Sequence, residues 1–226
     1  MSTAKDASVE HSARSLLHAG DLLIYQQRER AILQSLRLAG VTQQKLREVR
    51  ILEVGCGGGG ILPLLTYYGA TPGLLHGLDI DGTRVRSAQS RFSTMRFTRA
   101  DATRLPVRHR CYDIVLQSTM FSSILDSTQR KAAAAELVRV LRPGGFILWF
   151  DLRYNNPVNR RVRAVTRREI TLDLFPGAST HFVSAVLLPP LARRIAPLSL
   201  LLAEALTLLP PLRTHYCAVI RPTPGG

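Results

Sequence analysis

Short apolar runs alternate along this chain with longer stretches in which apolar residues recur at helical spacing. The runs predict strands at about 50–54, 74–79, 95–100, 112–116 and 146–150, with later strands at 181–188 and 215–221. The clearest helix is predicted over 128–141, capped by Asp126 or Ser127 and ended by Gly144. Strands that alternate with helices are typical of a doubly wound parallel sheet. The expected fold is therefore α/β, with one sheet of seven strands.

The length of the chain bounds its organisation. A chain of 226 residues supports one sizeable core and is short for two. We expect a single domain over 1–226, with a disordered segment at 1–10 and an N-terminal helical cap at 11–48, in which Gly20 or Gly40 makes a break. The leucine-rich segment 189–211 is open to three interpretations: a buried helix, a dimer face, or a greasy pocket for an acceptor.

The first strand is followed by a run of glycines. Gly55-Cys56-Gly57-Gly58-Gly59-Gly60 separates the apolar residues 49–52 from a helical pattern at 61–68. A strand, a glycine turn and a helix N-terminus together offer backbone N–H groups to a ligand, and glycine lets the main chain approach that ligand closely. The second strand ends on Asp79, where such folds place a carboxylate for two ribose hydroxyls.

The next strands also end on polar or small residues. Asp101-Ala102 follows the third strand, Gln117-Ser118 follows the fourth, and Pro143-Gly144-Gly145 precedes the fifth. In this order the motifs resemble those of the class I S-adenosylmethionine-dependent methyltransferases, in the broad bacterial group built on a minimal methyltransferase domain. The resemblance covers about residues 50–151 and implies a Rossmann-like sheet whose last strand is antiparallel. It also implies that 153–179 is a substrate-binding insertion.

The resemblance assigns roles around S-adenosylmethionine to residues of this sequence. It implies that the glycines approach the cofactor, that Glu53 faces its methionine end, that acidic side chains bind ribose and adenine, and that Gln117 and Ser118 border the sulfonium and the acceptor. The implied cofactor-binding residues are Glu53, Gly55, Gly57, Gly59, Asp79, Ile80, Asp101, Ala102, Gln117 and Ser118. A nicotinamide dinucleotide is the alternative, since the glycines satisfy Gly-x-Gly-x-x-Gly, but a carboxylate at Glu53 would repel a pyrophosphate.

The residues that would serve the acceptor lie in and after the fifth strand. Asp151, Tyr154 and His181 are the candidate catalytic residues, because an acceptor hydroxyl or amine must lose a proton. Asp151 could instead pair with Arg153. Arg153 and Asn155 are candidate substrate-binding residues, suited to an oxygen-rich or anionic acceptor, although Asn155 could equally stabilise its loop.

Composition narrows the choice of acceptor. The net charge of +14 attracts phosphates without specifying any, and nucleic-acid binding is not favoured because few aromatics lie among the arginines. No Asn/Asp-Pro-Pro-aromatic motif follows the fourth strand, and no cysteine nucleophile or catalytic metal cluster is evident. We therefore expect methylation of a small molecule, first an O-methylated sugar or natural product. An RNA methyltransferase and a non-catalytic cofactor-binding protein are the alternatives.

The remaining expectations concern the setting of the protein. The sequence has three cysteines without metal-ligand spacing, no apolar run of 18 residues, and no secretory signal in its opening segment. These features predict a reduced, cytoplasmic protein without a bound metal ion and without a transmembrane segment. A homodimer is left open.

Overall fold

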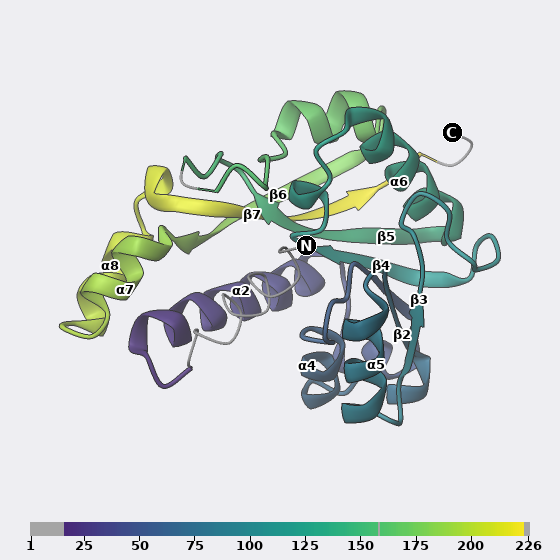
Figure 1. Cartoon of the computed structure of the whole chain (residues 1–226), viewed down its shortest axis with the longest axis horizontal. Coiled ribbons are helices and arrows are strands. Elements are labelled where there is room, and N and C mark those ends of the chain that lie inside the picture. The colour runs from purple at the N-terminus through teal and green to yellow at the C-terminus, as the bar shows by residue number, and fades with distance from the viewer. Residues whose placement is uncertain (1–15, 158, 224–226) are drawn as a thin grey trace, which may run out of the picture. The chain divides into compact units, whose positions relative to one another are not determined.

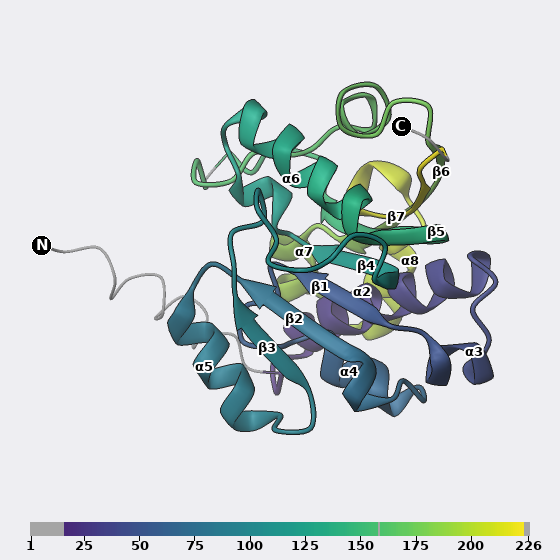
Figure 2. The same ribbon diagram turned by 90° about the vertical axis from the view of Figure 1, so that its right-hand side faces the viewer.

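The computed structural model describes residues 16–157 and 159–223, so the segment 1–10 lies outside the described residues. Seven strands form one mixed sheet in the order β3-β2-β1-β4-β5-β7-β6, with the last strands antiparallel, as expected. The strands, labelled in Figure 1 except for β1, which Figure 2 labels, are β1 (Ile51–Val54), β2 (Leu75–Asp79), β3 (Arg96–Arg99), β4 (Tyr112–Ser118), β5 (Leu141–Leu152), β6 (Ser179–Leu187) and β7 (Arg213–Arg221). The Rossmann-like methyltransferase fold predicted from the sequence is confirmed.

The register of the parallel strands aligns their carboxyl ends. Val54 of β1 lies opposite Leu78 of β2 on one side and Gln117 of β4 on the other. Asp79 lies opposite Arg99, and Ser118 lies opposite Phe150. The polar residues that end these strands therefore share one edge of the sheet, where ligands of open parallel sheets bind.

Helices connect the strands, and Figure 2 shows α4, α5 and α6 flanking the first five strands. The α-helices are α2 (Ala19–Leu38), α3 (Gln43–Glu48), α4 (Leu62–Tyr67), α5 (Gly82–Arg91), α6 (Ser127–Val140), α7 (Pro189–Ile195) and α8 (Leu200–Thr207). Short 3-10 helices lie at Pro72–Leu74, Phe121–Ser123 and Pro210–Leu212, and a π-helix at Glu169–Leu174. Pro63 lies in the first turn of α4, where a missing N–H costs no hydrogen bond.

Two glycines behave differently from the expectation. Helix α6 is capped by Asp126, whose carboxylate accepts from Gln129 N, but it ends at Val140, and Gly144 lies inside β5. Gly144 has φ +78°, and the register of β5 against β4 shifts at this point, so the glycine makes an irregularity in the strand. Gly40 follows the end of α2 with φ +79°, as a break should, whereas Gly20 lies within α2. A Cβ on Gly20 would meet the backbone of Arg193 in α7 at 2.4 Å, so this glycine permits close helix packing.

The described chain divides into two compact units. One unit comprises residues 34–183 and 216–223, and its core joins the sheet to α6 and to the π-helix through Leu137, Trp149 and Phe175. The other comprises residues 16–33 and 184–215, with a small core of Leu23, Leu187 and alanines from α7 and α8. The single domain expected over 1–226 stays a prediction.

The leucine-rich segment does not form the buried helix that was one of its three interpretations. It forms α7, α8 and a 3-10 turn, and most of its leucines are exposed. None of the described helices is both long enough and apolar enough to cross a membrane.

Candidate cofactor and acceptor site

The glycine turn after β1 is built from left-handed backbone. Gly55, Gly57 and Gly59 have φ values of +77°, +54° and +77°, which residues with a Cβ rarely adopt. The three glycines face different surroundings. No atom lies within 4 Å of a Cβ placed on Gly57, whereas one on Gly55 would meet Met120 at 2.7 Å and one on Gly59 would meet Phe97 at 3.2 Å. Gly57 therefore offers open backbone, while Gly55 and Gly59 allow close packing, and cofactor contact by all three stays a prediction.

Asp79 is held against the glycine turn. Its Oδ2 accepts a hydrogen bond from Gly57 N at 2.8 Å, and its Oδ1 accepts one from Asp81 N at 2.9 Å. A carboxylate has about four lone-pair positions, so two N–H donors leave acceptor capacity for two ribose hydroxyls. The next residue, Ile80, is an apolar side chain left 63% exposed. This pair suits a ribose beside an apolar adenine face.

The end of β3 supplies a second exposed carboxylate. Asp101 Oδ1 accepts hydrogen bonds from Thr103 N and Thr103 Oγ1, both at 2.8 Å. These bonds lower the pKa of Asp101 below its ordinary value, so the carboxylate is charged at neutral pH. Ala100 N donates to Asp79 O, which connects the loop of Asp101 and Ala102 to the end of β2. The predicted ribose and adenine residues thus lie on adjacent strand ends.

Glu53, just before the glycine turn, and Cys56, within it, are both buried. Glu53 is buried in β1, and the Cys56 thiol is buried after it. Burial raises the pKa of Cys56, and the nearby Glu53 and Asp79 carboxylates raise it further. Cys56 is therefore a neutral, unreactive thiol at physiological pH. Contact between Glu53 and the methionine end of a cofactor stays a prediction.

The loop after β4 crosses the glycine turn. Thr119 has φ +56°, an unfavourable backbone for a β-branched residue, and its N–H donates to Phe150 O at 2.8 Å. The strained turn directs Met120 onto Gly55. Gln117 has no exposed surface, its Oε1 accepts from Met120 N at 3.1 Å, and its Nε2 donates to Phe150 O at 3.4 Å. Its side chain therefore supports the loop, and Ser118, which is partly exposed, is the better placed of the two to meet a ligand.

Asp151 does not fit the role of a base in contact with the acceptor. It has no exposed surface, and its two oxygens accept from Ser122 N at 3.1 Å and from Leu152 N at 2.8 Å. Burial raises the pKa of Asp151 to about 6, while the hydrogen bonds from Ser122, Leu152 and Gln117 act in the opposite direction. The carboxylate joins the loop after β4 to the end of β5, which is a positioning role. The alternative interpretation, an ion pair between Asp151 and Arg153, is not found within the described part of the chain. The Arg153 guanidinium lies instead over the rings of Tyr154 and Tyr216.

Arginine and aromatic side chains stack where β5 ends. The Arg153 guanidinium lies over the rings of Tyr154 and Tyr216, 4.5 and 5.0 Å from their centroids. Arg167 lies over Tyr216 and Phe182, at 4.8 and 5.0 Å. We call these five residues the arginine–aromatic stack. Each cation is favoured by the negative face of a ring, and the stack holds two guanidinium groups against the same tyrosine.

The other predicted acceptor residues have separate positions. Asn155 Oδ1 accepts from Ala164 N at 2.8 Å, so its side chain stabilises the insertion, as one of its two interpretations proposed. Tyr154 is 46% exposed within the arginine–aromatic stack, and His181 is exposed on the edge strand β6. A catalytic role for either stays a prediction.

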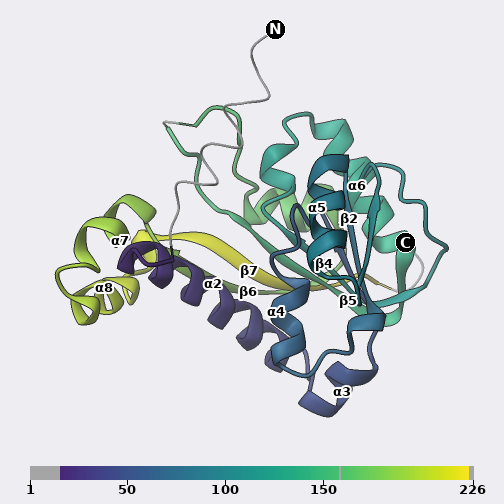
Figure 3. The same cartoon turned by 60° about the horizontal axis from the view of Figure 1, so that its bottom comes forward.

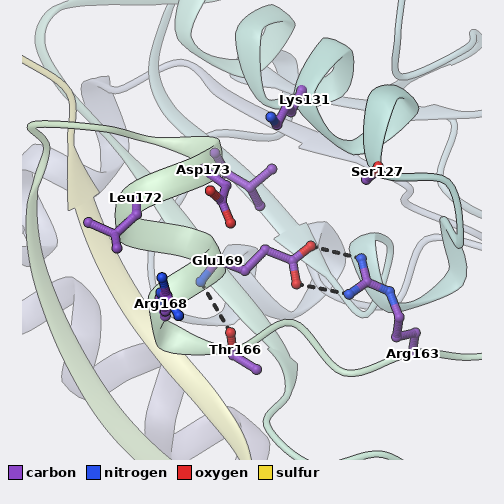
Figure 4. A pocket seen from close by; sticks show the side chains of 9 residues that line it. Ser127, Lys131, Arg163, Thr166, Arg168, Glu169, Leu172 and Asp173 are labelled. Atoms are coloured by element: carbon purple, nitrogen blue, oxygen red, sulfur yellow. Dashed lines mark hydrogen bonds and ion pairs between the residues drawn. The ribbon is translucent and has the colours of Figure 1, made fainter.

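A buried arginine secures the insertion. Arg130 of α6 has no exposed surface, and it donates to Ile124 O at 2.6 Å, to Glu169 Oε1 at 2.8 Å and to Arg163 O at 2.8 Å. Glu169 also pairs with Arg163 in an open pocket between α6 and the π-helix (Figure 4). That pocket contains none of the individual side chains predicted for the cofactor or the acceptor, although most of its lining belongs to the insertion 153–179, whose substrate-binding role stays a prediction. The pocket is lined by both carboxylates and cations, and Glu169 in its lining is already paired with Arg163.

Sequence reasoning missed several residues that shape this edge of the sheet. They are Thr119 and Met120 of the loop after β4, Arg130 of α6, and Arg167, Phe182 and Tyr216 of the arginine–aromatic stack. The local sequence carries a weak signal only for Arg130, an arginine at the buried spacing of Ala133, Ala134 and Leu137. The other contacts join distant segments and have no local signature.

The residues present fit S-adenosylmethionine at the carboxyl ends of β1, β2 and β3. The open space at Gly57, the spare acceptor capacity of Asp79, the exposed Ile80 and the charged Asp101 match a ligand with a ribose and an adenine. Within the described residues, no group of three histidine, cysteine or acidic side chains could hold a metal ion.

Comparison with known proteins agrees with this geometry. Residues 51–145 match the family model described as a methyltransferase domain. The phthiotriol/phenolphthiotriol dimycocerosates methyltransferase of Mycobacterium leprae (strain TN) is 34% identical over 150 residues, which cover 62% of this chain and 54% of the relative. The fatty-acid O-methyltransferase of Mycolicibacterium smegmatis is 30% identical over 161 residues, covering 66% and 55%. The chain thus spans about half the length of these curated relatives.

A solved structure extends the likeness of fold to nearly the whole chain. The crystal structure of a SAM dependent methyltransferase from Aquifex aeolicus superposes with a TM-score of 0.61 at 13% identity, covering 96% of this chain and 97% of the other. At this level of identity the likeness concerns the fold.

Proposed function

We propose, from the premise that this chain belongs to the class I S-adenosylmethionine-dependent methyltransferases, that its acceptor is the carboxylate of a long-chain lipid. S-adenosylmethionine, when bound, supplies an electrophilic methyl group on a sulfonium. The chain's part is to hold cofactor and acceptor in line and to exclude water, because positioning accounts for much of the rate in such a displacement.

The names of two relatives support a lipid acceptor. One is named for phthiotriol and phenolphthiotriol dimycocerosates and the other for fatty acids. The second is also named as an O-methyltransferase, which agrees with the oxygen acceptor expected from the sequence. These names motivate a lipid in place of the sugar or natural product that was first expected.

The arginine–aromatic stack is the observation that favours a carboxylate over a hydroxyl. A fatty acid is already ionised at neutral pH, so the enzyme needs a cation to orient it and no base to deprotonate it. Arg153 and Arg167 present guanidinium groups at the end of β5, the edge at which Asp79 and Ser118 also lie. Asp151, the nearest carboxylate in sequence, is buried and occupied by two N–H donors.

A matched pair of acceptors tests this proposal. The purified chain is incubated with labelled S-adenosylmethionine and either palmitic acid or the alcohol of the same length, and the products are identified by mass spectrometry. We expect the methyl ester, with a rate that stays level between about pH 6.5 and 9 because the acceptor has already lost its proton. Methylation of the alcohol and not the acid, or a rate that rises steadily with pH, would contradict the carboxylate.

Charge removal in the stack gives a second test. Arg167→Gln should raise the KM for palmitate about 10-fold, the scale of one hydrogen bond to a charged group, with little change in cofactor binding. Arg168→Gln is the matched control, since it removes an exposed charge one residue away. Equal effects of the two variants would assign the loss to net charge and not to the stack.

The cofactor is tested separately. Asp79→Ala should weaken S-adenosylmethionine binding by roughly 1.5–3 kcal/mol in calorimetry, the scale of hydrogen bonds involving a charged group. Asp113→Ala is a control that removes a partly exposed carboxylate, the one paired with Arg142. Submicromolar retention of RNA on a filter at physiological salt would instead favour the RNA methyltransferase. A cytoplasmic location remains part of the proposal, motivated by the free cysteines Cys56, Cys111 and Cys217.

A further inference from the structure

Helix α8 is oriented with its polar side inward. The face of α8 that packs on α2 and α7 carries Ala203, Glu204 and Thr207. Leu201 and Leu202 are exposed on other sides of the helix, and further exposed leucines lie at its two ends, whereas Leu206 packs partly against the core of this unit. Figure 3 shows α7 and α8 at the end of β6. A helix on the surface of a protein in water normally has the reverse arrangement, with leucines inward and acidic residues outward.

The exposed leucines of α8 and its flanking turns lie close together in the sequence. Each is at least half exposed, up to 85% for Leu201 and 84% for Leu198. We call this set the outer leucine surface; it consists of Leu198, Leu200, Leu201, Leu202, Leu208 and Leu209. Single exposed leucines are ordinary, but six in twelve residues form a patch of the kind that marks an interface with another molecule or a membrane.

Specific polar contacts hold α8 in this orientation. Glu204 pairs with Arg30 of α2, and Thr207 Oγ1 accepts from Gln27 Nε2 at 2.7 Å. Gln27 Oε1 in turn accepts from Leu187 N at 2.8 Å. Turning the helix to bury Leu201 and Leu202 would break the contacts of Glu204 with Arg30 and of Thr207 with Gln27, and the buried Gln27 would lose its Thr207 partner. The exposure of the leucines is therefore built into the packing of this unit.

The ends of α8 are also secured. Ser199 caps the first turn by accepting from Leu202 N at 3.2 Å, and Arg213 Nε donates to Thr207 O at 2.6 Å beyond the last turn. Prolines at 197, 210 and 211 limit the freedom of the flanking segments. The surface is thus presented on a defined scaffold, so little conformational entropy is lost when it meets a partner.

An apolar surface suggests two occupants, a second copy of the chain or a membrane, and the charge of the protein favours the membrane. The described part of this unit carries five arginines and three carboxylates, and two of the carboxylates, Asp21 and Glu204, are neutralised by ion pairs with Arg193 and Arg30. Arg194, at the end of α7, is exposed. A second copy of a chain with net charge +14 would be repelled, whereas an anionic bilayer would be attracted.

We infer that the outer leucine surface docks this protein on the surface of an anionic lipid bilayer, with leucines entering the acyl boundary and arginines at the level of the head groups. Exposed leucines on a short helix, in a protein with an excess of basic residues, are features of helices that lie in the interfacial plane of a membrane. The inference does not depend on the proposed acceptor, because docking is a property of this unit whether or not a lipid is methylated.

Vesicle sedimentation tests the inference with the full chain and no acceptor. The probes are vesicles of phosphatidylcholine alone and vesicles with one third phosphatidylglycerol. We expect the chain to bind the anionic vesicles, more weakly at 0.5 M salt, and to bind the neutral ones least. Failure of the wild-type chain to bind anionic vesicles at low salt would overturn the inference.

Two variants separate the apolar and the electrostatic contributions. Leu201→Gln with Leu208→Gln should weaken vesicle binding at least about 10-fold, because each leucine loses apolar area that would be buried. Leu125→Gln with Leu172→Gln is the control, since these two leucines are also more than half exposed but lie in the other unit. Arg194→Gln should reduce binding to anionic vesicles about 5-fold and leave binding to neutral vesicles unchanged.

Two results would contradict membrane docking by the outer leucine surface. Equal loss of binding in the two leucine double variants would show that the outer leucine surface has no special role. Analytical ultracentrifugation that finds a dimer, lost on Leu201→Gln with Leu208→Gln, would show that the leucines bind a second copy. A monomer whose vesicle binding alone is lost supports docking, and circular dichroism confirms that each variant is folded.

Discussion

Helices α6 and α8 differ in the kind of side chain that they turn toward the protein. Helix α6 buries Ala133, Ala134, Leu137 and Val140 against the sheet, as the hydrophobic effect favours. Helix α8 fully buries Ala203 alone and exposes three of its leucines, Leu200, Leu201 and Leu202, with polar contacts on its inner face. Both helices nevertheless place a charged side chain toward the protein, Arg130 in α6 and Glu204 in α8. The difference shows that apolar composition predicts a helix here but does not predict which of its faces is buried.

The largest expected effect on stability comes from Arg130, the buried charged side chain of α6. Arg130→Met should reduce the free energy of unfolding by about 3–5 kcal/mol, because Glu169 loses one of its two arginine partners and two partly buried carbonyls lose their donors. Urea denaturation measures the change. Lys131→Met, at the exposed neighbouring position, should change stability by less than about 0.5 kcal/mol. A small effect of Arg130→Met would mean that the insertion is held by other contacts.

A pair of leucine truncations tests the comparison directly. Leu137→Ala should cost about 2–5 kcal/mol of stability, because it leaves a cavity in the core. Leu201→Ala should change stability by less than about 0.5 kcal/mol, because that side chain already faces outward. Thermal and urea unfolding of the two variants provide the measurement. Similar losses in both would show that α8 turns its leucines inward in solution.

The buried carboxylate at the end of β5 should give a pH signature. Its pKa rises from 3.8 in the unfolded chain to about 6 in the folded protein, so between these values the folded state retains a proton that the unfolded state has lost. The contribution of Asp151 is therefore fully present below about pH 4 and is lost as the pH rises through 6, a change of about 3 kcal/mol. The difference between the stability profiles of wild type and Asp151→Asn isolates it, and Asp173→Asn is the exposed control. An unchanged profile in Asp151→Asn would show that its pKa is ordinary.

The smallest expected effect concerns the polar anchor of α8. Glu204→Gln removes a partly exposed ion pair with Arg30 and should cost less than about 1 kcal/mol at low salt. In 0.5 M salt wild type and variant should converge, because exposed charges are screened. A loss above 2 kcal/mol that persists in high salt would mean that this pair is essential for the orientation of α8.

Much of the sheet, and the edge at which the candidate cofactor residues gather, was predictable because the signals are local. Apolar runs placed all seven strands within a few residues, and the polar residues that follow them meet at one edge because parallel strands share a direction. The glycines and Asp79 are a case in point, since their sequence spacing already implied a turn with a carboxylate beside it, and Asp79 indeed accepts from Gly57 N.

The acceptor side was harder to predict because its contacts are distant in sequence. Asp151 is a plausible base by sequence alone, but the loop of Ser122 closes over it and supplies a hydrogen-bond donor from 29 residues away. Arg153 acquires its second aromatic partner, Tyr216, from β7. A local pattern of residues cannot reveal these encounters, which depend on the order of strands in the sheet.

The sequence by itself determined the α/β fold and the order of the strand-end motifs, because these follow from hydrophobic periodicity and from turn chemistry; the methyl donor was predicted from the resemblance of these motifs to a family. Only the tertiary structure decided which polar side chains are accessible at the candidate site, which are buried supports, and which side of α8 faces the rest of its unit. In α8 that choice rests on a hydrogen bond between Gln27 and Thr207, 180 residues apart. The free energy of such a contact exists only once the chain has folded, so no window of sequence contains it.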